Sequence, residues 1–496
     1  KDLAFSFSTD RFLVGFVWQP AGFVLTAVLL GVALAKLPLL AAVGLVAGTA
    51  VFILILIEPL VGVALALLAG PLGAWEAVKF GPSPLDSGQI ILLLTAAAWL
   101  AQGLSRKRIQ LHLTGLLVPL GLFVLVTAVT VVNAISIPVG LRELLKWVEM
   151  GVLLVIVVER VDGRASRIYL LLSMLLLPGV LQAAFAFWQF ALRGSGPAHF
   201  QINERLFRAY GTFMQPNPLG GYINLTALLA LGTLLGFVVV GWQNRGLRRN
   251  WGIIALLVGT VGVTGLGLLA SWSRGAWLGF AAALPALLFF WPRKRWHGFW
   301  LLVGTAIVGG GLLLTAVQFH LLPSTILDRL TGFQDDLVLG DVRGEDITNS
   351  NFSVLERLAH WQAAVGMARD HLWLGVGFGN YEPAYADYAL INWPAPLGHA
   401  HNFYLNMLAE TGVIGLGVYL LFWTAVFVQI IRLLEVSDWR DRGILLGLLA
   451  AWTAVSIHHL VDKLYVNNIY IHMGVMFGLQ QVLAQKYKTH MEEKHT

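Results

Sequence analysis

Long apolar runs alternate with short polar connections over most of this chain of 496 residues. Each run is about 20 residues long, enough to cross the ~30 Å hydrocarbon core of a bilayer as a helix. Glu58-Pro59 is consistent with either a tight turn or a kink, which leaves the helix count open. The pattern predicts an all-α polytopic integral membrane protein, a single membrane domain over 1–496 with about 12 to 14 transmembrane helices. The runs lie near 13–34, 37–57, 59–78, 89–103, 113–133, 143–158, 168–192, 217–240, 251–270, 277–291, 299–318, 402–431, 443–460 and 465–484.

One long stretch, residues 319–401, breaks the apolar pattern. It is predicted to be a loop inserted between transmembrane helices and to contain short helices. Apolar residues at 354, 358, 361 and 365 have the spacing of one helical face. We expect a helix there that lies along the membrane surface.

Basic residues fix the expected orientation of these helices. From the fourth run onward, clusters of three follow every second helix, and positive charge marks the cytoplasmic side. We therefore expect cytoplasmic N- and C-termini and an extracytoplasmic (periplasmic) 319–401 loop. The clusters are Arg106-Lys107-Arg108, then Arg160, Arg164 and Arg167, then Arg245, Arg248 and Arg249, then Arg293-Lys294-Arg295, then Arg432, Arg440 and Arg442, then Lys486, Lys488 and Lys494.

Composition supports the membrane assignment and narrows the chemistry. Hydrophobic residues make up 57% of the chain and charged residues 12%, whereas soluble domains carry roughly 25% charged residues. The net charge of +6 is explained by the basic cytoplasmic loops, so no nucleic-acid partner is expected. The absence of cysteine excludes disulfides, thiolate metal sites and thiol nucleophiles.

The basic residues on the predicted outer side are the informative ones, because topology argues against them. Arg208 precedes a polar turn that leads to Asn217, Arg274 follows Ser273 in a short turn between apolar helices, and Arg357 lies in the long loop. An arginine buried between helices is costly without an anionic partner, and its planar guanidinium suits phosphate. The plainer alternatives are an arginine that reaches the interface or that pairs with a carboxylate.

The predicted loop ends in a His-x-His pair, His399 and His401. Imidazole binds zinc and related ions, but two ligands are too few and no further metal motif is present, so no metal is expected. One positioned histidine can act as a general base without metal, and a capping or core role is the plainer alternative. His459 and Asp462 belong to a second polar cluster, near the outer end of the last helices, that would brace the site.

These segments together resemble the O-antigen ligase and O-antigen polymerase superfamily. The resemblance runs from about 200 to 425 and rests on the order, spacing and common outer placement of its motifs. The motifs are Gly211-Thr212-Phe213 with Asn217, Ser271-x-Ser273-Arg274-Gly275-Ala276, Arg357 with Trp361, Gly375-x-Gly377-x-Gly379-Asn380, and His401-Asn402-x-Tyr404-Leu405.

The resemblance implies an inverting, metal-independent glycosyltransferase without a cofactor in the bacterial inner membrane. Its partners would be a glycan donor on undecaprenyl pyrophosphate and an acceptor hydroxyl, on lipid A core for a ligase or on another lipid-linked repeat unit for a polymerase. By motif position, His401 would be the catalytic histidine, and Arg274 and Arg357, joined by Arg208, would bind the donor diphosphate. The expected supporting residues are His399, Asn402, Tyr404, Asn217, Ser273, His459 and Asp462.

A transporter or flippase of a lipid-linked or anionic substrate is the rival from another class. Intramembrane charge and broken helices would suit it. The sequence shows no inverted repeat, however, and its polar residues concentrate on one face instead of at the midplane.

Overall fold

The computed structural model describes residues 3–4, 28–29, 31–32, 35–81, 85–106, 110–111, 115–202, 206–243, 247–321, 325, 327, 329, 341–348 and 351–493. Most of the predicted first run, 13–34, lies outside these residues. So do parts of the 319–401 loop and, among the basic clusters, Lys107, Arg108, Arg245 and Lys494.

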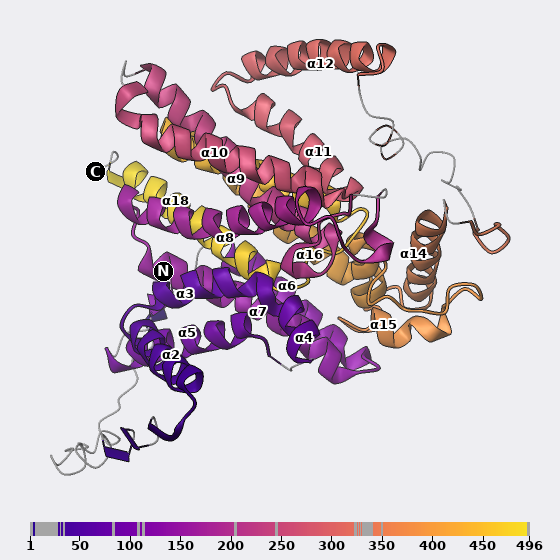
Figure 1. Cartoon of the computed structure of the whole chain (residues 1–496), viewed down its shortest axis with the longest axis horizontal. Coiled ribbons are helices and arrows are strands. Elements are labelled where there is room, and N and C mark those ends of the chain that lie inside the picture. Colours follow the sequence, from indigo (N-terminus) through magenta and orange to yellow (C-terminus); the bar gives the residue numbers. More distant parts are fainter. Residues whose placement is uncertain are drawn as a thin grey trace.

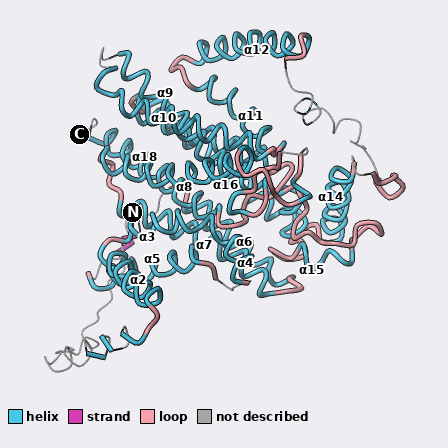
Figure 2. Tube along the Cα trace, in the orientation of Figure 1, coloured by secondary structure: helices cyan, strands magenta, loops and turns pink. Residues whose placement is uncertain are grey.

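Helices make up most of the described chain, as Figures 1 and 2 show. The two strands, β1 (Leu3–Ala4) and β2 (Gln110–Leu111), form a two-residue antiparallel pair. The α-helices are α2 (Leu39–Ile57), α3 (Pro59–Ala69), α4 (Gly73–Phe80), α5 (Ser87–Ser105), α6 (Leu117–Thr130), α7 (Ile137–Arg160), α8 (Ala165–Ala191), α9 (Pro216–Gln243), α10 (Leu247–Ser271), α11 (Arg274–Phe290), α12 (Arg295–Gln318), α14 (Phe352–Asp370), α15 (Tyr381–Ala384), α16 (Phe403–Val436), α17 (Trp439–His458) and α18 (Ile469–Glu493). The 3₁₀ turns are η1 (Gly70–Leu72), η2 (Val131–Asn133), η3 (Ala198–Phe200), η4 (Gly211–Phe213) and η5 (Tyr385–Asp387).

The polytopic all-α prediction is confirmed. Among the described residues, seven helical segments are long and apolar enough to span a membrane, and three shorter apolar helices accompany them. Three more long helices, α7, α17 and α18, carry more polar residues. The expected count of 12 to 14 transmembrane helices requires that these three also cross the membrane. The seven are Pro59–Phe80, Ser87–Ser105, Ala165–Ala191, Pro216–Gln243, Asn250–Ser271, Arg295–Gln318 and Phe403–Val436.

Glu58-Pro59, which the sequence left open as a turn or a kink, is a break between two helices. Glu58 adopts extended backbone angles, φ −136° and ψ 98°, and ends α2. Its carboxylate accepts a hydrogen bond from the Leu60 amide, while Pro59 occupies the first turn of α3. Proline suits that position because its missing N–H has no helical partner to lose.

The centre of the bundle is the pair α9 and α17. Glycines let the backbones of the two helices come into direct contact. A Cβ added to Gly232 on α9 would lie 2.2 Å from the backbone nitrogen of Gly447 on α17, and one on Gly236 would lie 2.4 Å from the carbonyl oxygen of Trp439. Small residues permit such close approach between helices in a membrane. This contact holds the ends of α9 and α17 in a fixed relation.

Helix α16 is not one straight rod. Gly412 interrupts it with φ 63° and ψ −169°, and the Phe403 and Tyr419 rings lie 5.3 Å apart. Sixteen residues of straight helix would separate them by about 24 Å, so residues 403–411 fold back beside the start of 413–436. The sequence predicted a single helix over 402–431, which is wrong at this point because one glycine reverses the chain.

The predicted basic loops gather at one end of the bundle. Arg160 donates to the Gln102 side chain at 2.6 Å, Lys486 lies 2.6 Å from Asp441, and Arg293 donates to the backbone between α16 and α17. Figure 1 shows the C-terminus at this end and α14 and α15 at the opposite one. The alternation of basic and non-basic loops therefore corresponds to two ends of the molecule.

Candidate functional site

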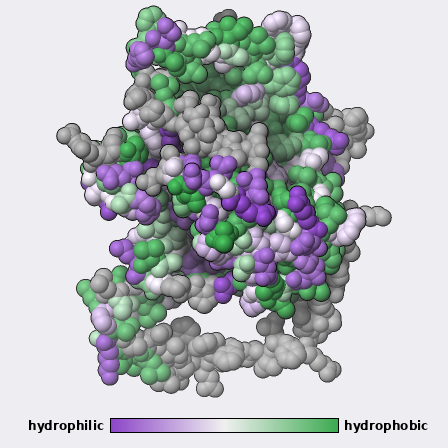
Figure 3. Space-filling model, turned by 90° about the vertical axis from the view of Figure 1, so that its right-hand side faces the viewer, coloured by the Kyte–Doolittle hydropathy of each residue, from purple (hydrophilic) through white to green (hydrophobic). Residues whose placement is uncertain are grey.

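The candidate site lies at the end of the bundle opposite the basic loops, where several connections meet. Figure 2 shows loops concentrated there, and Figure 3, which views this side, shows hydrophilic side chains gathered across the middle of the face. Several non-glycine residues in these turns have left-handed backbone angles, among them Met214 with φ 57°, Trp272 with φ 52° and His401 with φ 52°. Such conformations cost about 1–2 kcal/mol each and persist where surrounding contacts impose them.

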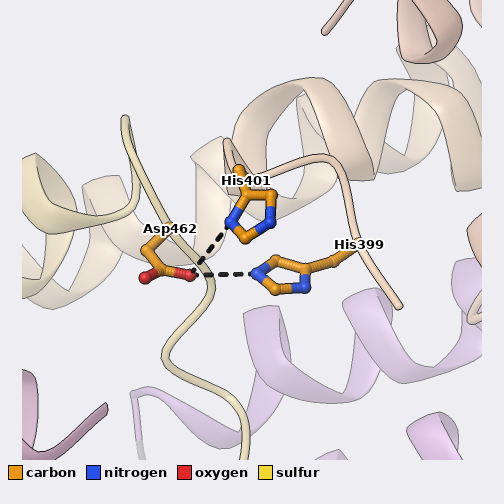
Figure 4. Close-up of side chains that lie close together, drawn as sticks. All are labelled: His399, His401 and Asp462. Carbon is orange, nitrogen blue, oxygen red and sulfur yellow. Dashed lines mark hydrogen bonds and ion pairs between the residues drawn. The ribbon is translucent and has the colours of Figure 1, made fainter. Parts of the chain in front are cut away.

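Asp462, in the connection between α17 and α18, is the hub of the site (Figure 4). Its Oδ1 accepts a hydrogen bond from His399 Nε2 at 2.9 Å and lies 3.8 Å from His401 Nδ1. Its Oδ2 accepts from Asn217 Nδ2 at 2.8 Å. Burial alone would raise the pKa of the Asp462 carboxyl, but the two histidines hold it well below its usual range. Asp462 is therefore a buried carboxylate that binds three predicted site residues together.

Asn217, near the start of α9, connects this carboxylate to the arginine side of the site. Its Oδ1 accepts hydrogen bonds from Ser273 Oγ at 2.9 Å and from Arg208 at 3.3 Å. Ser273 is also the N-cap of α11, where its hydroxyl accepts from the Ala276 amide. The helix start that presents Arg274 is thus tied to Asn217 by one serine side chain.

Four arginines act on one another electrostatically at this end. Burial lowers the pKa of Arg208 to about 10, and the charges of Arg357 and Arg274 add to the lowering. Burial likewise lowers the pKa of Arg329 to about 9, together with the charges of Arg208, Arg274 and Arg357. A guanidinium stays charged at neutral pH, so the shifts mean that the cluster repels itself. A bound anion would relieve this repulsion.

Two of these arginines retain unused donors. The Nε atoms of Arg208 and Arg357 are buried and have no hydrogen-bond partner among the described residues. Arg329 instead donates to the Trp272 carbonyl oxygen, at 3.3 Å from Nε and 3.0 Å from Nη2. Unmatched buried donors are costly, and a phosphate oxygen is a matching acceptor.

His401 borders the arginines and is poised as a neutral acceptor. Neither ring nitrogen has a hydrogen-bond partner among the described residues, since 3.8 Å to Asp462 is too long for a hydrogen bond. Burial lowers the pKa of His401, with further lowering from the charges of His399 and Arg357, while Asp462 opposes the shift. The imidazole is therefore neutral at physiological pH and has a free lone pair for a proton.

His399 supports Asp462 in a different way. Its Nδ1 lies 3.2 Å from the Leu397 carbonyl oxygen and its Nε2 lies 2.9 Å from the Asp462 carboxylate. Both partners are acceptors, so only the doubly protonated ring donates to both. The two histidines of the pair thus differ: both ring nitrogens of His399 lie near hydrogen-bond acceptors, while neither nitrogen of His401 has a partner among the described residues.

The remaining predicted residues make hydrogen bonds with the backbone around the site. Asn402 is the N-cap of the short helix 403–411, accepting from the Tyr404 and Leu405 amides at 3.0 and 3.1 Å. The Tyr404 hydroxyl donates to the Ser456 carbonyl oxygen at 2.9 Å. His459 is fully buried, with its carbonyl oxygen accepting from the Phe403 amide at 2.7 Å.

The predicted helix is present as α14, but its buried face is shifted from the expected one. Val354, Leu355, Ala359 and Ala363 are buried, whereas residues 358, 361 and 365 are half-buried. Arg357 lies on the half-buried side and reaches the arginine cluster. The shift follows from packing against the rest of the loop, which the spacing of apolar residues alone does not specify.

A metal ion is the alternative occupant. The ligand atoms of His399, His401 and Asp462 all lie within 4.8 Å of one another, a set that fits zinc or a related ion. Against this, the four arginines outnumber the nearby carboxylates of Asp462 and Glu356, which disfavours a further cation. The charge balance of the site suits an anion.

Sequence reasoning missed two residues of this site. Arg329, in the same predicted outer loop as Arg357, meets the criterion that singled out the other arginines, because topology does not explain a basic residue there. His360 lies on α14 beside His401, with 5.8 Å between ring centroids. No sequence pattern marked His360, since its proximity to His401 arises only from the fold.

Comparison with known proteins agrees with the motif resemblance. Residues 259–420 match the family model described as O-antigen ligase. The matched segment contains Arg274, Arg329, Arg357 and His401, and it excludes Asp462, which meets them only in the folded chain. No curated protein matches the chain.

Proposed function

We propose that this chain is a membrane glycosyltransferase, a proposal supported by the match of residues 259–420 to the O-antigen ligase family model. The proposed reaction moves a glycan from undecaprenyl pyrophosphate to an acceptor hydroxyl on lipid A core, at the outer face of the bacterial inner membrane. The observation that carries the proposal is the self-repelling cluster of four arginines beside a neutral, uncommitted histidine.

The arginines would hold the donor diphosphate. Arg208 and Arg357 each have a buried Nε without a partner among the described residues, and Arg274 and Arg329 bring the charge of the cluster to four. A leaving pyrophosphate gains negative charge as the glycosidic bond breaks, so these charges stabilise the transition state more than the ground state. This arrangement supplies the charge that a divalent ion provides in other transferases.

His401 would act as the general base. Its free nitrogen takes the proton of the acceptor hydroxyl as that oxygen attacks the anomeric carbon. The bond from the anomeric carbon to the phosphate oxygen breaks, and undecaprenyl pyrophosphate leaves with the electron pair. Asp462 lies near enough to stabilise the imidazolium that forms. A single displacement of this kind inverts the anomeric configuration.

A lipid-facing groove beside the site would accept the polyprenyl chain. A cavity of about 340 Å³ between α16 and α17 is lined by Leu420, Trp423 and Phe427 among others, with hydroxyls from Tyr404, Thr424 and Ser456. All three hydroxyls already donate to backbone carbonyl oxygens within the protein. The three hydroxyl protons are used within the protein and the rest of the lining is mainly apolar, which suits a hydrocarbon chain.

The test is reconstitution in lipid nanodiscs with glycan-loaded undecaprenyl pyrophosphate and one of two acceptors. Transfer of one glycan to lipid A core supports the ligase proposal. A ladder of products with a second lipid-linked unit instead supports the polymerase alternative. Absence of transfer to either acceptor, with donor crossing between leaflets of proteoliposomes, would favour the transporter.

Two variants test the assigned roles. His401→Ala and Arg274→Ala are expected to abolish detectable transfer while leaving the protein folded and inserted, since one charge-stabilising contact is worth about 10²–10³ in rate. Wild-type transfer in either variant would contradict the mechanism. Transfer that is lost with EDTA and restored by a divalent ion would favour the metal alternative at His399, His401 and Asp462.

A further inference from the structure

His360 is a buried polar side chain that the proposed chemistry does not use. It lies on α14 and is 1% exposed. One face of its ring stacks on Tyr385, with 4.6 Å between centroids and 19° between planes, and its edge approaches His401 at 5.8 Å and 79°. The ring is therefore held in one orientation beside the proposed base.

The hydrogen bonds of Tyr381 determine which nitrogen of His360 carries the proton. The Tyr381 hydroxyl donates to the backbone carbonyl oxygen of His360 at 3.1 Å, and His360 Nδ1 lies 2.9 Å from the same hydroxyl oxygen. A hydroxyl has a single hydrogen, so when it is given to the carbonyl, Nδ1 must be the donor of the second bond. His360 is then the Nδ1–H tautomer, with a lone pair on Nε2.

That lone pair has no partner within the described protein. His360 Nε2 is buried without a hydrogen-bond partner, as are both ring nitrogens of His401 next to it. Burial lowers the pKa of His360 to about 4, and the charges of His401 and His399 act in the same direction. His360 is therefore a poor base at neutral pH and serves only as a hydrogen-bond acceptor. A buried acceptor left unpaired destabilises the protein, and a bound donor would offset that loss.

We propose that Nε2 of His360 accepts a hydrogen bond from a second hydroxyl of the acceptor sugar, one that neighbours the attacking hydroxyl held by His401. The inference rests on the proposed glycosyl transfer and adds a specificity determinant to it. Two adjacent imidazoles with free lone pairs match two hydroxyl donors on neighbouring carbons. A sugar with a vicinal diol at the point of attachment is the acceptor class that this pair would select.

The experiment compares acceptors that differ by one oxygen. The probes are the acceptor that supports transfer in the reconstituted assay and its two monodeoxy analogues, each lacking one hydroxyl that flanks the attacking oxygen. With wild-type protein, one analogue is expected to lose about tenfold or more in kcat/KM, because the His360 lone pair is then left unpaired. The other analogue reports on contacts elsewhere in the site.

Variants of His360 test whether the loss of kcat/KM with the deoxy acceptor arises from Nε2 of His360. His360→Phe keeps the stack on Tyr385, and Tyr381 retains its backbone acceptor, so the protein is expected to fold and to treat the hydroxyl and deoxy acceptors alike. His360→Asn places an amide near Nδ1 but none near Nε2 and should also lose discrimination. His360→Gln reaches the Nε2 position with its amide oxygen and should restore part of it.

His371→Phe is the matched control, because His371 is an exposed histidine just beyond the end of the same helix. It should discriminate as the wild type does. Transfer with unchanged discrimination in the His360 variants would overturn the inference while leaving the proposed function intact. Absence of transfer by the wild-type protein would instead count against the proposed function.

Discussion

At the scale of single residues, the site divides between groups that are fully bonded and groups that are not. Asp462, Asn217 and His399 use their polar atoms in hydrogen bonds with one another and with neighbouring groups. Four other residues have buried nitrogens without a hydrogen-bond partner among the described residues: both ring nitrogens of His401, Nε2 of His360, and the Nε atoms of Arg208 and Arg357. The concentration of such unpaired buried groups at one place supports the proposal that a polar substrate binds there.

Asp462→Asn tests whether the charge of Asp462 stabilises the protonated form of His401, the proposed base. Asp462 opposes the lowering of the pKa of His401, so removing its charge should lower that pKa further. The base form then persists to lower pH, and the acidic limb of the pH–kcat profile is expected to move toward acid. The maximal rate should fall by about 10–100-fold because the imidazolium loses its counter-charge. The exposed Asp387→Asn should leave both unchanged, and a limb displaced toward alkaline pH would contradict the assignment.

Arg329→Gln tests the residue that sequence reasoning missed. Gln keeps some hydrogen-bonding capacity toward the Trp272 carbonyl but removes one charge from the cluster. Transfer should fall by about 10²–10³, and the thermal stabilisation that undecaprenyl pyrophosphate gives the wild type should shrink. Arg343→Gln, an exposed arginine of the same loop paired with Asp341, is the control. Equal transfer rates and equal thermal stabilisation in the two variants would show that Arg329 does not belong to the site.

Most residues of the candidate site could be predicted from the sequence, but their contacts with one another could not. Arg208, Arg274, Arg357 and His401 carry recognisable local motifs, so each could be selected from its own segment. The stacking of His360 near His401 depends on how α14 docks, which no local pattern encodes. Ring packing and unpaired nitrogens become visible only in three dimensions.

At the scale of elements, the decisive feature is the reversal inside α16. It returns residues 403–411 beside Tyr419 and places His401 next to the end of α17, where His459 and Asp462 lie. Hydrophobic periodicity predicted the apolar run but not its reversal, because Gly412 is as compatible with a helix interior as with a sharp turn. Only contacts with the glycine-rich segment 375–379 distinguish the two.

Gly412→Ala tests the reversal. A Cβ there would lie 2.3 Å from the backbone carbon and oxygen of Trp373, and the φ of 63° with extended ψ is accessible almost only to glycine. We expect a loss of stability of about 3 kcal/mol or more, read as a fall in melting temperature in detergent, together with loss of transfer.

Gly417→Ala is the matched control on the same helix. A Cβ at Gly417 meets nothing within 4 Å, and alanine is favoured over glycine in a helix interior by about 1 kcal/mol. Melting temperature and transfer should therefore stay the same or rise slightly. A Gly412→Ala protein as stable and active as Gly417→Ala would show that α16 tolerates a straight path.

At the scale of the whole molecule, the proposed function depends on the separation of two ends of the bundle. Helix α11 runs for 17 residues, about 25 Å, from Arg274 in the site to the connection that carries Arg293, Lys294 and Arg295. The basic connections meet at that second end. The alternation in the sequence anticipated this division because retention of positive charge on one side acts on each loop separately.

Which end faces the cytoplasm can be tested directly, because the chain contains no cysteine. Asp387→Cys introduces one exposed thiol at the site end, and Lys294→Cys introduces one at the basic end. In spheroplasts, a membrane-impermeant maleimide should label Asp387→Cys at once and Lys294→Cys only after permeabilisation. The reverse order of labelling would show that the topology is opposite to the predicted one and that the arginine cluster lies at the cytoplasmic leaflet. A donor presented on the outer leaflet could not reach it there, so the same result would also exclude the proposed reaction.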